Sequence, residues 1–146
     1  MFQEGQMNST SRLYRDLFTT ICTFLVITCT PLNALAKDLT GDEVAALISG
    51  NTVEAIHVSR GYKITTYYAP DGSYIQLSKG KRQQGKWHID DNGCLCKQRG
   101  GKGGECRLIV EDGAIWKAYK IPRNMMKQRK HKRDFIKITQ GNPNKL

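Results

Sequence analysis

The sequence predicts a mainly β protein in which a short N-terminal helix precedes an antiparallel meander of about seven or eight strands, closed as a small barrel or sandwich. Three observations predict this class. Segments rich in β-forming side chains recur at intervals of about ten residues after Asn51, turn-forming residues separate them, and side chains alternate between apolar and polar within them. Closing such a meander removes the exposed edges of an open sheet.

Residues 1–36 have the order of a cleavable signal peptide. Arg12 and Arg15 precede an apolar run over residues 17–32, and Ala34-Leu35-Ala36 places small residues at the two positions that a signal peptidase reads. The run is short and threonine-rich for a membrane span, so a retained anchor is only the alternative. We therefore predict cleavage after Ala36 and a periplasmic or secreted protein.

Residues 37–146 are predicted to form one small β-rich domain with a basic C-terminal segment. The two arginines of the signal segment balance Glu4 and Asp16, so the formal charge of +10 belongs to residues 37–146. An excess of this size favours acidic partners: anionic lipid, acidic polysaccharide, nucleic acid or another polyanion. An envelope protein is a further candidate partner.

The first predicted element is a helix that begins after Thr40. Thr40 and Glu43 have the spacing of a capping box, in which each side chain accepts a hydrogen bond from the other residue's backbone amide. Residues 44–48 are good helix formers with one apolar face, and Gly50-Asn51 ends the run. A helix this short is expected to pack across one end of a sheet.

The strands follow, separated by turn residues that tolerate positive φ, as in Arg60-Gly61 and Asp112-Gly113. The predicted strands cover residues 52–59, 62–69, 73–78, 85–89, 94–98, 106–111, 114–121 and 134–139. In the second of them, Tyr62, Ile64, Thr66 and Tyr68 share one face. Such aromatic side chains are expected in the core or at the barrel mouth, with a ligand pocket as the alternative.

Several motifs together resemble a known family. They are Asn51-Thr52-Val53, Tyr67-Tyr68-Ala69-Pro70-Asp71-Gly72, Gly85-x-Trp87, Asp91-x-Gly93-x-Leu95-Cys96, Cys106 and Gly141-Asn142-Pro143. This set resembles a family of small secreted proteobacterial proteins of unknown function, with the pattern Gly-Asn-Thr, Tyr-Tyr-x-x-Asp-Gly, Gly-x-Trp, Cys, Cys. The resemblance covers nearly all of residues 38–145. It implies an envelope or secreted location and a compact β domain, and no catalytic residue. Cys94 and the basic stretch 125–133 depart from the pattern.

Three cysteines follow the predicted cleavage site: Cys94, Cys96 and Cys106. In an oxidising compartment, Cys96 and Cys106 on adjacent strands would close a disulfide. Cys94 and Cys96 share a strand face, so Cys94 would compete for Cys106. The remaining thiol would be buried or available for a disulfide-linked dimer. The alternative hypothesis is a metal or redox site that adds His88 to the three thiols, since thiolates with one imidazole suit zinc or copper(I).

The basic stretch 113–133 carries eight cationic side chains and no carboxylate. Unbalanced positive charge attracts polyanions and anionic lipid. Met125 and Met126 are the only apolar residues between Ile121 and Phe135, which predicts a solvated loop there. The predicted anion-binding residues are Lys117, Lys120, Arg123, Lys127, Arg129, Lys130, Lys132 and Arg133, with Arg99 and Lys102 adjoining.

The glycine-rich segment 99–104 is predicted to be a flexible hairpin connection whose free amides offer a non-specific anion nest. It lacks the Gly-Lys-Ser/Thr ending of a nucleotide-binding loop.

No motif of a metalloprotease, serine hydrolase or cysteine–histidine enzyme occurs in the sequence, and no cofactor is expected. We therefore expect a non-catalytic exported binding module with a basic face for an anionic envelope component or polyanion. The alternative is a thiol-based metal-binding or redox protein.

Overall fold

The computed structural model describes residues 35–121 and 128–146, apart from side-chain detail at residues 102–103. The predicted signal peptide lies almost entirely outside this range. Residues Ala34–Leu146 belong to one compact unit. Within the described ranges, no helix has both the length and the apolar character needed to cross a membrane.

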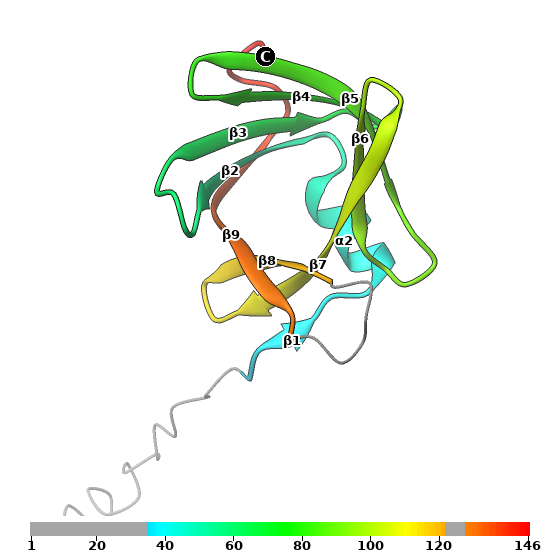
Figure 1. The fold of residues 1–146 in the computed structure, drawn as a ribbon, viewed down its shortest axis with the longest axis vertical. Coiled ribbons are helices and arrows are strands. Elements are labelled where there is room, and N and C mark those ends of the chain that lie inside the picture. The colour runs from blue at the N-terminus through cyan, green and yellow to red at the C-terminus, as the bar shows by residue number, and fades with distance from the viewer. Residues whose placement is uncertain (1–34, 122–127) are drawn as a thin grey trace, which may run out of the picture. The chain divides into compact units, whose positions relative to one another are not determined.

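Eight antiparallel strands form a closed barrel, as the sequence predicts (Figure 1). Each strand from β2 to β8 pairs with the next strand along the chain, and β9 pairs back with β2. A short additional strand, β1, pairs with Val110 and Glu111 of β7. These residues lie beyond Arg107, where the pairing between β7 and β6 stops. The strands are β1 (Lys37–Asp38), β2 (Asn51–His57), β3 (Lys63–Tyr68), β4 (Ser73–Ser78), β5 (Lys81–Ile89), β6 (Leu95–Arg99), β7 (Lys102–Asp112), β8 (Ile115–Lys120) and β9 (Lys130–Gln140).

All eight predicted strands are present, but three are longer than predicted. β5 starts at Lys81, β7 at Lys102 and β9 at Lys130. The added residues are mostly charged or polar, so they carry no hydrophobic alternation. One expectation was consequently wrong: residues 130–133 belong to β9 and not to a solvated loop. The predicted hairpin connection within residues 99–104 is present as a two-residue turn between β6 and β7. Gly100 and Gly101 form this turn, with φ of 56° and 71°.

The helix α2 (Gly41–Ile48) closes one end of the barrel. Its capping box is present as predicted: the Thr40 hydroxyl accepts from the Glu43 amide, and the Glu43 carboxylate accepts from the Thr40 amide at 2.8 Å. Val44 and Ile48 are fully buried and join the core cluster with strand residues from around the barrel. Figure 1 shows α2 within the outline of the ring of strands. The helix therefore packs across one end of the sheet, as expected.

Strand alternation puts Tyr68, Trp87, Leu95, Ile109 and Phe135 into the interior at this closed end. Tyr68 and Trp87 meet edge to face, with ring centroids 5.9 Å apart. The indole N–H of Trp87 donates to the Ala69 carbonyl at 2.9 Å, which satisfies its polar atom inside the barrel. The closed half of the barrel is thus filled by aromatic and aliphatic side chains.

Candidate functional site

The far end of the barrel is lined by polar and charged side chains that face inward. In β6, Leu95 belongs to the buried core, and alternation puts Lys97 and Arg99 on the same inner face. In β7, Ile109 is in the core, so Arg107 and Glu105 face inward as well. One face of each strand therefore changes from apolar to charged along its length.

Arg133 in β9 supplies another inward cation. Its register partner across the barrel seam is His57, and the next inward pair along the two strands is Ala55 with Phe135. Burial and the neighbouring Arg107 lower the pKa of Arg133 from its ordinary value. Burial lowers the pKa of His57 too, and the Arg133 charge adds to the effect. At this position Arg133 is an interior residue of the barrel.

These side chains surround a cavity of about 340 Å³ at the open end. One wall carries the cations Lys97, Arg99, Arg107 and Arg133, with Glu105 as the only carboxylate among the described lining residues. The opposite wall comes mainly from β3 and β4 and is neutral: Tyr62, Ile64, Tyr74, Gln76 and Ser78, with Gln83 from β5. Four cations thus share a small volume with one anion.

Lys97 sits at the inner end of this cavity. Its ammonium group donates to Gln76 Oε1 at 2.7 Å and lies 4.4 Å from the centroid of the Tyr74 ring. Burial lowers its pKa well below the ordinary value, and the charges of Arg133 and Arg107 lower it further. A cation held this way has a strong preference for an additional negative charge nearby.

Arg107 and Arg133 are incompletely paired within the described part of the chain. Arg107 Nη2 contacts Glu105 Oε2 at 2.5 Å, whereas Nε of Arg107 and Nε of Arg133 are buried without a hydrogen-bond partner. The Arg107 charge keeps the pKa of Glu105 low although burial raises it. Unpaired buried donors are costly, and an acceptor that reaches them would be bound strongly.

The predicted anion-binding residues divide into distinct groups. Lys117 forms an ion pair with Asp112, and Nη1 of Arg129 donates to both carboxylate oxygens of Asp38, at 2.8 and 3.0 Å. Arg133 points into the cavity. Arg123 and Lys127 lie outside the described residues, as does the side chain of Lys102.

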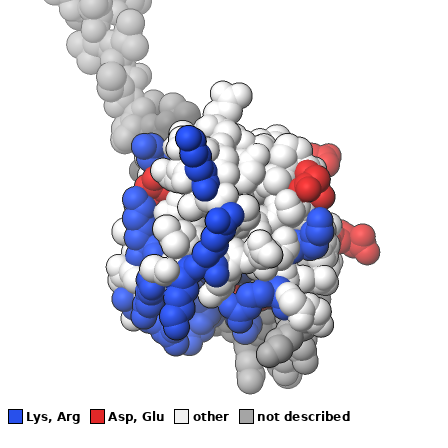
Figure 2. Space-filling view, turned by 90° about the horizontal axis from the view of Figure 1, so that it is seen from above, with Lys and Arg blue, Asp and Glu red and all other residues white. Residues whose placement is uncertain are grey.

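The remaining predicted cations lie at the open end of the barrel. Lys120 and Lys130 are register partners on β8 and β9, and Lys120 also pairs with Arg107 of β7. Burial and the charges of Lys130 and Lys120 lower the pKa of Lys132. In Figure 2, most of the Lys and Arg side chains in view gather on one side of the face, where a single acidic side chain lies among them, and the other Asp and Glu side chains lie on the opposite side. Like charges therefore concentrate around the rim of the cavity.

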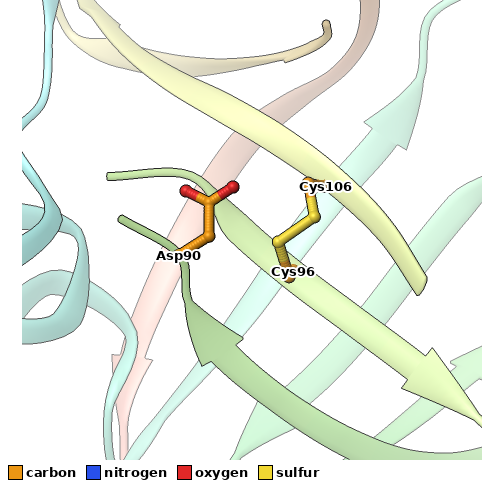
Figure 3. A group of neighbouring side chains, drawn as sticks. All are labelled: Asp90, Cys96 and Cys106. Atoms are coloured by element: carbon orange, nitrogen blue, oxygen red, sulfur yellow. A yellow bond between two sulfur atoms is a disulfide. The ribbon is translucent and has the colours of Figure 1, made fainter. Parts of the chain in front are cut away.

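The predicted disulfide is present. Cys96 and Cys106 are register partners on β6 and β7, with Cα atoms 3.9 Å apart, and their sulfur atoms are bonded. Figure 3 shows the Asp90 carboxylate beside this disulfide, and ligand atoms of the three residues lie within 4.8 Å of one another. Asp90 Oδ1 accepts from the amide of Cys94 at 2.8 Å. A bonded sulfur pair offers no thiolate to a metal, so this group could act as ligands only after reduction.

Cys94 and His88 do not join the group of possible metal ligands that the metal hypothesis requires. Cys94 is 1% exposed and packs with Leu108 and Val110 in a small cluster separate from the main core. Burial and the nearby Asp90 raise the pKa of its thiol. His88 is exposed and pairs in register with Cys96, yet it is not among the side chains gathered at the disulfide, where Asp90 takes its place. A disulfide-linked dimer through Cys94 would require local opening.

Four charged residues of these sites were missed in the sequence: Lys97, Arg107, Glu105 and Asp90. The signal for the first two was present, because Leu95-x-Lys97-x-Arg99 and Arg107-x-Ile109 keep the two-residue period of an inward face. Charged side chains at such positions are read as solvent-facing unless the end of the barrel is known to be polar. Asp90 looked like an ordinary turn residue.

The fold and site define a closed eight-stranded antiparallel barrel with a helix across one end and a cationic cavity at the other. No protein-family model matches the chain, and neither the curated proteins nor the solved structures contain a match.

Proposed function

We propose that this protein is an exported, non-catalytic binding module that holds anionic groups at the cationic open end of its barrel. The observation that carries the proposal is the cavity lining, in which four cations face a single carboxylate. Uncompensated charge inside a partly desolvated pocket is stabilised most by a bound counter-charge. Export is supported by the order of charged, apolar and small residues over residues 1–36.

The rim extends the attraction beyond the cavity. Lys120, Lys130 and Lys132 add three cations at the same end of the barrel. A cleft lined by one sign of charge raises the local concentration of oppositely charged ligands and speeds their association. The fitting partners are therefore anionic components of the cell envelope, such as anionic lipid, acidic polysaccharide or another polyanion.

The proposal is tested by binding of the full chain to heparin and to vesicles containing phosphatidylglycerol at low salt. Arg99→Glu reverses an exposed cation of the open end, and Lys86→Glu is the matched reversal on the outer face of β5. We expect Arg99→Glu to weaken binding about tenfold and Lys86→Glu to leave it nearly unchanged. Equal losses in both variants would mean that net charge alone is responsible, and absence of binding would refute the function.

The thiol-based alternative receives less support from the geometry. Two of the three sulfur atoms form a disulfide, and the third belongs to a buried thiol whose pKa is raised. Thiol reactivity and metal ligation both require the thiolate, which burial disfavours.

A further inference from the structure

The polarity of the cavity lining favours some kinds of anion over others. Among the eleven lining residues in the described part of the chain, Ile64 is the only aliphatic one, and it is 1% exposed. The ring of Tyr74 is 4% exposed, with Lys97 over one face and the backbone of Gly85 close beside it. The accessible lining is therefore polar, and an apolar ligand group would find little surface to cover.

The interior below the cavity leaves no path for a hydrocarbon chain. Tyr68 and Tyr74 close its inner end, with ring centroids 6.5 Å apart, and Trp87 packs edge to face on Tyr68 behind them. Tyr68 is 2% exposed. A lipid headgroup could reach the rim, but its acyl chain could not enter the barrel without displacing this aromatic core.

The charge balance points to more than one negative charge on the ligand. Glu105 pairs with Arg107 and neutralises one of the cations, which leaves Arg99, Arg133 and the protonated form of Lys97 without a carboxylate among the described lining residues. The unpaired Nε–H groups of Arg107 and Arg133 add two directed donors. Guanidinium groups match the planar or tetrahedral oxyanions of carboxylate, phosphate and sulfate.

We propose that the cavity binds a compact hydrophilic molecule carrying at least two oxyanion groups, and that Lys97 takes up a proton when it binds. This inference rests on the proposed function and narrows it to small polyvalent anions. A cavity of about 340 Å³ is at the lower end of the range for small-molecule sites, which suits a ligand of sugar or tricarboxylate size.

The proton uptake follows from what surrounds Lys97. The groups facing it are Tyr68 of β3, Tyr74 and Gln76 of β4, Arg99 of its own strand, Glu105 and Arg107 of β7, and Arg133 of β9. Burial and the two arginines lower the pKa of Lys97, so the empty site disfavours its charged form. A ligand anion offsets the arginine charges and raises that pKa, so protons are bound together with the ligand.

The experiment is titration calorimetry of the full chain at pH 8 in buffers of different ionisation enthalpy. The probes are citrate, inorganic pyrophosphate and a heparin-derived disaccharide, with laurate and glucose as controls. We expect at least one polyvalent probe to bind one-to-one with uptake of up to one proton, and neither control to bind. The three probes distinguish carboxylate, phosphate and sulfate as the preferred group.

Two variants test the residues. Lys97→Met should remove the proton uptake, and Arg133→Met should weaken binding by about tenfold or more, since the variant loses the charge-assisted hydrogen bonds of the guanidinium group. Arg99→Met, at the exposed rim, provides the same test if Arg133→Met does not fold. Proton uptake that persists in Lys97→Met, unchanged binding in the arginine variants, or preferred binding of laurate would overturn the inference.

The outcomes also separate the inference from the proposed function. If heparin and anionic vesicles bind but none of the compact anions does, the cationic end is a polyanion surface and the inference fails alone. If no anionic probe binds, both fail.

Discussion

The ammonium nitrogen of Lys97 lies 4.4 Å from the centroid of the Tyr74 ring, which places a cation over an aromatic face inside the barrel. Tyr74 in turn pairs in register with Gly85 of β5. A Cβ atom built at Gly85 would lie 2.8 Å from Cε1 of the Tyr74 ring. The missing side chain of Gly85 therefore makes room for the ring that supports Lys97.

Gly85→Ala is expected to destabilise the protein by about 3 kcal/mol or more. The added methyl would also lie 2.0 Å from the Gln98 carbonyl oxygen, and this backbone atom cannot move without shifting β6. Chemical denaturation measures the loss. Gly80→Ala is the control: its φ is +70° but nothing lies within 4 Å, so only the left-handed backbone is strained, at about 1 kcal/mol. Similar stability losses in the two variants would contradict the close packing at Gly85.

The contribution of Lys97 to stability is expected to depend on pH. Its folded-state pKa lies well below the ordinary value of 10.5, so between the two values the unfolded chain binds more protons than the folded one. The buried ammonium group therefore destabilises the folded protein by its full amount when the pH is below the folded-state pKa of Lys97. This destabilisation disappears as the pH rises towards 10.5. Lys97→Met should increase the free energy of unfolding most at the low-pH end of this window.

Denaturant unfolding of wild type and Lys97→Met across that pH range measures the effect. Lys86→Met, on the outer face of β5, is the matched control. A difference between wild type and Lys97→Met that stays constant with pH would show that the ammonium group is not desolvated in the folded protein.

The Cys96–Cys106 disulfide is expected to contribute about 2–3 kcal/mol, because it closes a loop with a sequence separation of 10. Cys96→Ala/Cys106→Ala should lower the free energy of unfolding by that amount. In unfolded protein that lacks residues 1–36, and with them Cys22 and Cys29, thiol titration before reduction should detect the free Cys94 but neither partner of the disulfide, and reduction should release both. Cys94→Ala is the control, since it keeps the disulfide. Three reactive thiols before reduction would contradict the bond.

The capping box at α2 makes a separate prediction. Thr40→Ala removes the acceptor for the Glu43 amide and should cost about 1 kcal/mol. Thermal or denaturant unfolding measures this loss, and Asp42→Asn, in the same first turn but outside the capping box, is a control expected to have a smaller effect.

Glu43 should also make the stability of the protein decrease at acidic pH. The Lys37 ammonium and the Thr40 amide hold the pKa of its carboxyl at about 2, below the ordinary value of 4.5. Its contribution is therefore present above pH 4.5 and is lost as the pH falls towards 2. Glu43→Gln should flatten this part of the pH–stability curve, and a curve that keeps its slope in Glu43→Gln would assign the decrease at acidic pH to other carboxylates.

Local sequence determined most of the barrel. The Thr40–Glu43 spacing set the start of α2, the turn residues set the order of eight strands, and the position of Cys96 and Cys106 on adjacent strands gave the disulfide. These features depend on neighbours along the chain or on one hairpin, so periodicity and turn chemistry were sufficient to predict them.

The cavity was decided only by the tertiary structure. Lys97, Arg107 and Arg133 come from β6, β7 and β9, and closure of β9 onto β2 brings them around one interior space. In the sequence Arg133 belonged to a run of basic residues that looked solvated, because a strand with a charged inner face lacks the apolar alternation that marks a strand. Which charges face water and which face each other depends on where the barrel ends, and that is a property of the closed sheet.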